Sequence, residues 1–281
     1  MRGADLSDLE ALAWQIELGA DEAIGDAPVN RFEEAKATET PVTEAPAMES
    51  KPAAPRGSDV SATTASGAPP GPDTDAHPRI AEAGSLEDLA EMLKAWDGTP
   101  LKEGARNFVF SDGLPGAHLM VVGEAPGAEE DRQGKPFVGR AGQLLDQMLA
   151  AIGLSRSETD PAKAAYITNI LPWRPPGNRT PSEQEAGMFV PFVERHIQLA
   201  GPRVILTMGN TPTKALLKTT TGIKRMRGNW VRHEATALPL IPTFHPAYLL
   251  RQPADKRLSW FDLIAVKKAL GGEEPQIGTP L

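Results

Sequence analysis

The sequence predicts an α/β protein: a three-layer α/β/α sandwich around a four-stranded, mainly parallel sheet, preceded by a disordered N-terminal region. Two observations lead to this prediction. Short apolar runs alternate with longer segments of helical periodicity in the C-terminal two-thirds, which is typical of a parallel sheet covered on both faces. The first third lacks the large apolar side chains that a core requires and is rich in proline and acidic residues.

Residues 1–25 are predicted to contain one short amphipathic helix. Apolar residues recur there at helical spacing, at Leu6, Leu9, Ala13 and Ile16. Two interpretations stay open for this helix. It is either a docking element for a partner protein or a helix that lies on its own domain.

Residues 26–84 are predicted to form a disordered linker. Nine prolines fall within this segment, and between residues 34 and 79 the only aliphatic side chains larger than alanine are Val42, Met48 and Val60. Residues 1–76 also hold fifteen acidic and five basic side chains, so the acidity of the chain belongs to its front and the remainder is nearly neutral. Such a segment cannot bury enough apolar surface to offset the entropy of ordering it.

Composition excludes several classes of protein. The chain has no cysteine, which excludes disulfides, thiolate catalysis, cysteine-ligated zinc and an all-cysteine iron–sulfur centre. It has no apolar run of about eighteen residues, so we expect no membrane span. The N-terminus lacks the basic-then-apolar order of a signal peptide, and we therefore expect a cytoplasmic protein.

The folded part is predicted to span residues 85–272, followed by a tail at 273–281. Ser85 is expected to cap the first helix of this part. Four short apolar runs are expected to form the buried strands: Leu119–Val122, Ala165–Ile170, Val204–Met208 and Leu238–Phe244. Segments of helical spacing lie between and after these runs: Ala141–Ile152, Ser182–Leu199, Thr211–Leu217 and Lys256–Leu270.

Unusual polar motifs follow three of the four predicted strands. GEAPG comes after the first strand, TNILPWRPPGNR covers the end of the second, and TFHPAYLLR covers the end of the fourth. The carboxyl ends of parallel strands meet at one edge of a sheet, where ligands bind in folds of this kind. The sequence therefore predicts one composite site built from these three motifs.

Familiar nucleotide-binding and metal-binding motifs are missing. GEAPG lacks the G-x-G-x-x-G spacing of a dinucleotide-binding loop, and Gly134-Lys135 is followed by Pro136, not by the serine or threonine of a phosphate-binding loop. None of the five histidines lies in an H-E-x-x-H pattern. Neither a nucleoside triphosphatase nor a zinc hydrolase is indicated.

Three motifs in order carry a resemblance to a known family: GEAPGAEEDRQGKPFVGRAGQLLD, YITNILPWRPPGNRTP and FHPAYLLRQP. In this arrangement the chain resembles the family-four uracil-DNA glycosylases, from about Leu86 to Leu270. The resemblance implies an enzyme of base excision repair that flips uracil out of DNA and hydrolyses its bond to deoxyribose. The N-terminal helix would then dock a repair or replication protein.

Two other functions stay open at this point. The first is a catalytically inactive protein that uses the glycosylase fold to bind DNA or a partner. The second is a nuclease that holds magnesium with Glu124, Glu129 and Asp131.

The resemblance also implies roles for individual residues. His245 matches the histidine that donates a hydrogen bond to the departing base, and Asn169 matches the asparagine that pairs with the edge of uracil. Phe137 matches the aromatic ring that stacks on the flipped base. Taken alone, Asn169 is as well explained by a buried side chain that ties down a loop, and Phe137 by a core residue.

The GEAPG loop is expected to bring main chain close to uracil and its sugar, through Gly123 and Ala125. Glu124 matches the functional glutamate of the family and is expected either to receive a polar contact or to act through water on the sugar carbon. Glu130 is a weaker candidate for a similar catalytic role, because Glu129-Glu130-Asp131 is also explained by a solvated acidic run.

A set of basic and amide side chains is expected to contact the DNA backbone: Arg140, Arg174, Asn178, Arg179 and Arg251. Each of them, taken singly, is also explained as a surface residue. Tyr248, Leu249 and Leu250 follow the histidine, where an apolar wedge enters the emptied base stack in this fold. Core packing is the alternative for the two leucines.

The chain departs from the family in one respect. The resemblance implies a 4Fe–4S cluster held by four cysteines, and those positions fall near Trp96, Thr99, Trp173 and Phe189. None of these side chains can ligate iron, so we expect no cluster and no metal. Three of the four are large aromatics, which predicts an apolar plug in the volume that a cluster would fill. Random loss in a decayed relative is the alternative.

Overall fold

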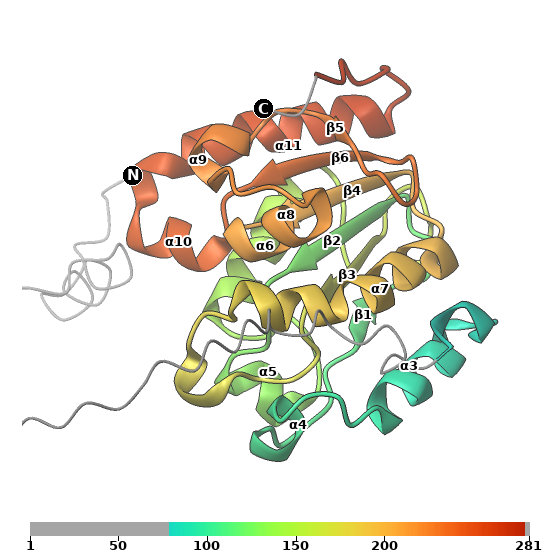
Figure 1. The fold of residues 1–281 in the computed structure, drawn as a ribbon. Coiled ribbons are helices and arrows are strands. Elements are labelled where there is room, and N and C mark those ends of the chain that lie inside the picture. Colours follow the sequence, from blue (N-terminus) through green and yellow to red (C-terminus); the bar gives the residue numbers. More distant parts are fainter. Residues whose placement is uncertain (1–78, 279–281) are drawn as a thin grey trace, which may run out of the picture. The chain divides into compact units, whose positions relative to one another are not determined.

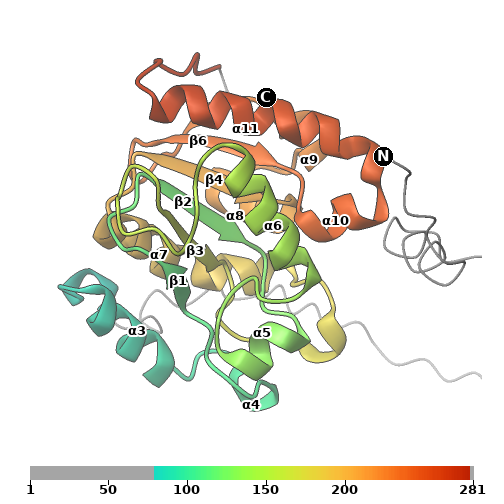
Figure 2. The same cartoon turned by 180° about the vertical axis from the view of Figure 1, so that it is seen from behind.

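The computed structural model describes residues 79–278 (Figure 1). The predicted N-terminal helix and residues 26–78 of the predicted linker lie outside the described residues, so both stay predictions. The described part is an α/β sandwich with helices on both faces of one sheet, as Figures 1 and 2 show from opposite sides. The predicted fold class is therefore confirmed.

The sheet has six strands, in the order β1-β3-β2-β4-β6-β5. Their bounds are β1 Ser111–Gly113, β2 Leu119–Gly123, β3 Ala165–Asn169, β4 Val204–Met208, β5 Val231–Arg232 and β6 Pro239–Thr243. The four central strands are parallel and match the four predicted strands. The prediction of four strands was wrong in number, because β1 and β5 add antiparallel edges. These edge strands are only three and two residues long, too short to leave an alternating pattern in the sequence.

Alternate side chains of the central strands enter two separate cores. Leu119 and Val121 of β2 belong to the core under α6 (Arg140–Ala151) and α11 (Lys256–Leu270). Met120 and Val122 belong to the core under α3 (Leu86–Ala95) and α7 (Glu183–Ala200). All five residues of β2 are buried, and the same is true of β3 and β4. Burial on both faces explains why these strands appear in the sequence as continuous apolar runs.

The helices lie close to their predicted places. The longer ones are α3 Leu86–Ala95, α6 Arg140–Ala151, α7 Glu183–Ala200, α8 Asn210–Leu217 and α11 Lys256–Leu270. Shorter helices join them: α4 Leu101–Gly104, α5 Ala128–Gln133, α9 Ile223–Met226, α10 Pro246–Arg251 and the 3-10 turns η2 Ile80–Glu82, η3 Pro176–Asn178 and η4 Pro253–Asp255. Ser85 and Ser182 each accept a hydrogen bond from the third helical amide, and both belong to capping boxes that fix where α3 and α7 begin.

The folded part begins before the predicted boundary at residue 85. Residues 80–82 form η2, and Ala83 is buried in the core. Arg195 of α7 donates two hydrogen bonds to the carbonyl oxygen of Ala83, at 2.6 and 3.2 Å. Residues 79–84 therefore belong to the domain and not to the linker, because burial of Ala83 and these two bonds tie them to α7.

A buried aromatic cluster lies between the early helix and the loop after β3. The ring of Trp96 makes an edge contact with Phe189 at 5.6 Å, and Trp173 lies 6.0 Å from Phe189 between ring centroids. All three side chains are at most 9% exposed, and Thr99 is buried as well. The predicted plug of three aromatics is therefore present as a packed cluster.

Within residues 79–278, no helix has the length and apolar character needed to cross a membrane.

Candidate active site

The carboxyl ends of β2 and β3 place Gly123 and Asn169 side by side. These two residues are paired in the parallel register of the two strands. The backbone stays joined beyond the strands, because Ile170 donates its N–H to the carbonyl of Gly123 and Leu171 donates to that of Glu124. The arrowheads of β2 and β6, which mark the carboxyl ends of these strands, point toward α10 (Figure 1). The first and second motifs therefore meet at this edge.

Phe137 lies against Gly123 and Asn169. A Cβ atom placed on Gly123 would overlap Oδ1 of Asn169 and come within 2.5 Å of ring atom Cζ of Phe137. Only glycine leaves room for both side chains at this point. The amide of Asn169 and the ring of Phe137 thus face the same backbone position, and both side chains are nearly buried.

His245 completes this group from the third motif. It caps α10, and its Nδ1 accepts a hydrogen bond from the N–H of Ala247 at 3.1 Å. The imidazole lies 5.4 Å from the ring of Phe137, with 29° between the two planes. Gly209 follows β4, has a φ of 96° and lies close to His245. A Cβ atom placed on Gly209 would come within 3.1 Å of the Cβ of His245.

The protonation of His245 follows from its surroundings. Burial lowers the pKa of His245 to about 4, the positive charge of Arg251 acts in the same direction, and Glu130 opposes both. The imidazole is therefore neutral at pH 7. Because Nδ1 accepts the bond from Ala247, the proton of the neutral ring sits on Nε2.

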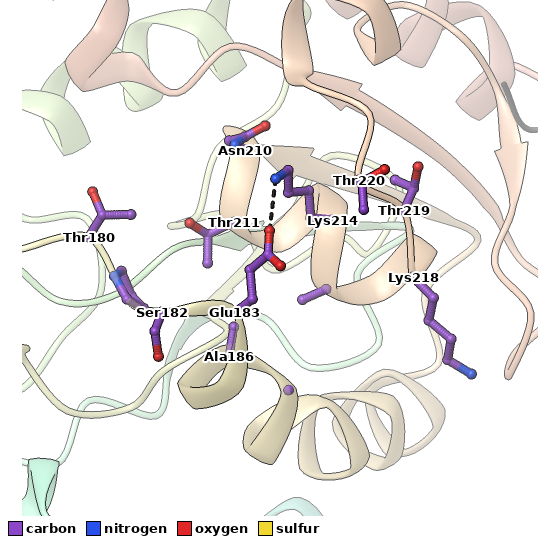
Figure 3. A pocket seen from close by; sticks show the side chains of 13 residues that line it. Thr180, Ser182, Glu183, Ala186, Asn210, Thr211, Lys214, Lys218, Thr219 and Thr220 are labelled. Atoms are coloured by element: carbon purple, nitrogen blue, oxygen red, sulfur yellow. Dashed lines mark hydrogen bonds and ion pairs between the residues drawn. The ribbon is translucent and has the colours of Figure 1, made fainter. Parts of the chain in front are cut away.

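The carboxylate of Glu124 is held by a residue of α8. Its Oε2 accepts a hydrogen bond from the hydroxyl of Thr211, in the first turn of α8, at 2.6 Å. Thr211 also lines a cavity of about 470 Å³ between the beginnings of α7 and α8. Figure 3 shows this cavity, whose wall carries threonine and lysine side chains and the ion pair of Lys214 with Glu183. Thr211 therefore lines this cavity and also binds the carboxylate of Glu124.

Glu130 points into its own loop. One carboxylate oxygen accepts from the N–H groups of Val138 and Gly139, both at 2.9 Å, and the other accepts from Gly127 at 3.1 Å. Three main-chain donors therefore occupy this carboxylate. The geometry fits a residue that shapes the loop and gives no support to the catalytic role expected for Glu130.

Comparison with known proteins assigns the family. The model of the uracil DNA glycosylase superfamily matches residues 110–266, more than half of the chain. The chain belongs to this superfamily. Proteins named type-4 uracil-DNA glycosylase are similar to it: that of Pyrobaculum aerophilum is 37% identical over 175 residues, which cover 60% of this chain and 86% of the relative. That of Archaeoglobus fulgidus is 32% identical over 200 residues, 69% of this chain and 97% of the relative.

The residues of this uracil-DNA glycosylase superfamily member that are predicted to contact DNA differ in their exposure and in the hydrogen-bond partners of their side chains. Arg140 and Arg251 are exposed, at the start of α6 and the end of α10. Arg174 and Asn178 bond to each other at 2.6 Å. Arg179 makes two bonds to Glu185, at 2.6 and 2.7 Å, and so has a structural partner at the beginning of α7.

The three residues after the histidine have different surroundings. Leu249 is fully buried, whereas Leu250 is 37% exposed. The hydroxyl of Tyr248 donates to Asp255 at 2.5 Å, and its ring packs on Phe244. The prediction that Leu249 contacts DNA was wrong, because the side chain faces the interior of the domain. Leu250 is the leucine of this pair that solvent reaches.

Sequence reasoning missed Thr211 and Arg156. Arg156 donates to the carbonyl oxygens of Pro136 and Phe137, both at 2.9 Å. Neither residue lies in one of the three motifs. Thr211 lies in the first turn of α8, after β4, and Arg156 lies in the loop after α6. Ala125, in contrast, was expected to line the uracil site, and its side chain packs against the core that contains the aromatic cluster.

Proposed function

We propose that this protein hydrolyses the N-glycosidic bond between uracil and deoxyribose in DNA, with His245, Asn169 and Phe137 around the base. The chain is an enzyme of the uracil-DNA glycosylase type, which its family and its named relatives support. The observation that carries the residue assignment is the meeting of Gly123, Phe137, Asn169 and His245 from three separate motifs at one edge of the sheet.

His245 stabilises the leaving base. When the bond from N1 of uracil to C1′ of the sugar breaks, the electron pair stays on the base and negative charge spreads to its carbonyl oxygens. A neutral imidazole with its proton on Nε2 donates a hydrogen bond to that charge. The low dielectric around the partly buried ring strengthens this bond.

Asn169 and Phe137 select the base. An amide side chain presents one acceptor and two donors, which match the N–H and carbonyl groups on the Watson–Crick edge of uracil. The ring of Phe137 supplies a flat surface for stacking. Gly123 lets the main chain approach the base, and the amide backbone of Ala125 continues the same loop.

Glu124 acts at the sugar. As the base departs, C1′ becomes electron-poor, and a carboxylate stabilises such a centre or orients the water that attacks it. Thr211 fixes one of its oxygens, so the other is left to face the substrate. Glu130 remains a sequence prediction as a catalytic group, and the bonds of its carboxylate favour a supporting role.

The DNA backbone is contacted by the exposed arginines Arg140 and Arg251, together with Arg174 and Asn178 on the loop after β3. Leu250 is the apolar side chain that fills the space left by the flipped nucleotide. A repair or replication protein docked by the N-terminal helix, and a cytoplasmic location, stay predictions from the sequence.

The enzyme does not use the iron–sulfur cluster that the family resemblance implies. The residues present do not fit such a group, because Trp96, Thr99, Trp173 and Phe189 offer no thiolate, and three of them pack as a buried aromatic cluster. This packing keeps the loop after β3 in place without metal. Iron present in stoichiometric amount in the purified protein would contradict this assignment.

A magnesium nuclease is the weaker candidate. The three carboxylates that would hold magnesium each bind a different partner. Glu129 pairs with Arg132 at 2.5 Å, and Glu124 accepts a hydrogen bond from Thr211. Asp131 accepts hydrogen bonds from the main-chain N–H groups of Arg106 and Asn107. Among residues 79–278, no group of three His, Asp or Glu side chains is arranged to hold a metal.

Release of uracil from a uracil-containing oligonucleotide in EDTA tests the proposal. We expect free uracil and an abasic site, with the strand intact until alkali is added. The same oligonucleotide with thymine in place of uracil is the control. Binding without release would support the inactive alternative, and strand cleavage that requires magnesium would support the nuclease.

A further inference from the structure

Phe137 has a backbone conformation that its residue type disfavours. Its φ is 52°, in the left-handed region that glycine or asparagine usually occupies. Gly142 of α6 lies directly under this turn, and a Cβ atom there would collide with the carbonyl group of Phe137. A phenylalanine stays in this conformation only where its surroundings hold it there.

Arg156 holds the two carbonyls of this turn. Its Nη1 donates to the oxygen of Pro136 and its Nη2 donates to the oxygen of Phe137, each at 2.9 Å. The guanidinium is itself fixed by ion pairs with Asp112 at 3.2 Å and with Asp146 at 2.8 Å. With its side chain only 12% exposed, Arg156 forms a rigid fork that matches two adjacent carbonyls.

Glu130 holds the two amides that follow. Its Oε1 accepts from Val138 and Gly139, directly after Phe137 in the chain. The peptide groups on the two sides of Phe137 are therefore bound by side chains of opposite charge. Arg156 comes from the loop after α6 and Glu130 from α5, so the turn is fixed against two different elements.

We propose that Arg156 and Glu130 are positioning residues that hold Phe137 in its left-handed conformation and so set the ring for stacking on uracil. The proposal rests on the role proposed above for Phe137. If the two side chains release the turn, the φ of Phe137 relaxes to a negative value and the ring leaves its place between Gly123 and His245. Neither Arg156 nor Glu130 touches the substrate in this proposal. Loss of either side chain slows uracil excision because the ring of Phe137 is displaced.

A double-mutant cycle with Arg156→Met and Phe137→Leu tests this inference. The measurement is the single-turnover rate of uracil release, at a temperature where every variant is folded. We expect Arg156→Met to lower the rate by roughly tenfold, the size of coupling typical of groups in contact. In the Phe137→Leu background the same change should lower the rate by less than about twofold.

The cycle distinguishes the proposed role of Phe137 in stacking from the proposed role of Arg156 in positioning. A Phe137→Leu enzyme with a wild-type rate would remove Phe137 from the mechanism, and the proposal would fall with it. Alternatively, Phe137→Leu is slow and Arg156→Met lowers its rate by the same factor as in the wild-type background. That result would support the role of Phe137 and overturn the positioning role of Arg156.

Arg195→Met is the matched control. Arg195 also donates two hydrogen bonds to a main-chain carbonyl, that of Ala83, in the turn before α3. We expect it to lower stability and leave the rate unchanged. Affinity for DNA with an abasic site, which has no base to stack, should be the same in Arg156→Met and wild type. Equal weakening of abasic binding and of excision would indicate a general folding fault and overturn the proposal.

Two further variants cover the case in which Arg156→Met does not fold. Arg156→Lys keeps the charge but supplies a single point donor for the two carbonyls, so an intermediate rate is expected. Glu130→Gln keeps an oxygen for Val138 and Gly139, whereas Glu130→Ala removes it. A Glu130→Gln enzyme clearly faster than Glu130→Ala supports positioning through hydrogen bonds. Equal losses in both would mean that the charge of Glu130 acts directly, which contradicts the proposal.

Discussion

The main-chain N–H of Ala247 donates a hydrogen bond to Nδ1 of His245, at 3.1 Å. This bond decides which nitrogen of the imidazole is free to donate. Burial lowers the pKa of His245 to about 4, so the ring is neutral at physiological pH and its single proton lies on Nε2. A histidine placed at the beginning of a helix, where positive charge is disfavoured, suits the same state.

Replacing His245 by alanine should lower the single-turnover rate of uracil excision by about 100-fold or more, because a preorganised donor to the leaving group is lost. Binding to DNA with an abasic site should change much less, since that product carries no base. Both quantities are measurable on one oligonucleotide pair. A His245→Ala enzyme that excises uracil at the wild-type rate would remove His245 from the mechanism.

Titration of His245 should not change the rate of uracil excision between pH 8 and about pH 5. Its pKa is lowered to about 4, so the neutral donor persists until the pH falls through that value, and only then does protonation of Nδ1 break the bond from Ala247. The single-turnover rate measured from pH 4 to pH 8 checks this. A tenfold fall between pH 7.5 and pH 5.5 that disappears in His245→Ala would contradict it.

Thr211→Val should slow excision by about tenfold, because removing a hydrogen bond to a charged group frees the carboxylate of Glu124. In a Glu124→Gln background the same substitution should have little further effect. Thr220→Val is the control, since Thr220 lines the same cavity and lies elsewhere on its wall (Figure 3). Equal losses from Thr211→Val with and without Glu124 would show that Thr211 acts by another route.

Leu249 and Leu250 should respond in opposite ways to alanine. Leu249 is fully buried, so its truncation should lower the free energy of unfolding by about 2–5 kcal/mol. Leu250 is exposed, so its truncation should leave stability nearly unchanged and slow excision from double-stranded DNA more than from single strands, where no stack has to be filled. Urea unfolding and excision assays on both substrates measure the two effects. Identical behaviour of the two variants would contradict the assignment.

Trp173→Ala should lower the free energy of unfolding by about 3–5 kcal/mol, because a large buried ring leaves a cavity next to Phe108 and Phe189. Trp260→Ala is the matched control, since the ring of Trp260 is 40% exposed and its loss should cost far less. Urea unfolding of both variants measures the difference. Similar costs for the two would mean that the aromatic cluster does not support the domain.

The candidate site was predicted in outline and missed in detail. His245, Asn169 and Phe137 were selected because each lies in a motif that follows or ends a strand, and the structure places their side chains close together, whereas their roles stay proposals. The catalytic role of Glu130 stays a sequence prediction, and the sequence did not indicate that this carboxylate accepts hydrogen bonds from three main-chain amides of its own loop. Thr211 and Arg156 were missed because their partners lie in other segments of the chain.

The sequence by itself determined the central strands, the longer helices and the three motifs of the site. These follow from local causes: continuous apolar runs, helical spacing, capping serines and the rule that parallel strands end at one edge. The tertiary structure decided which of two adjacent leucines is exposed, which carboxylates are occupied by main-chain amides, and how Phe137 is held at positive φ. These depend on contacts between residues far apart in the chain, such as Arg156 with Phe137 and Thr211 with Glu124. Local patterns carry no information about such pairs, because the approach of the two segments is fixed only when the sheet and its helices pack together.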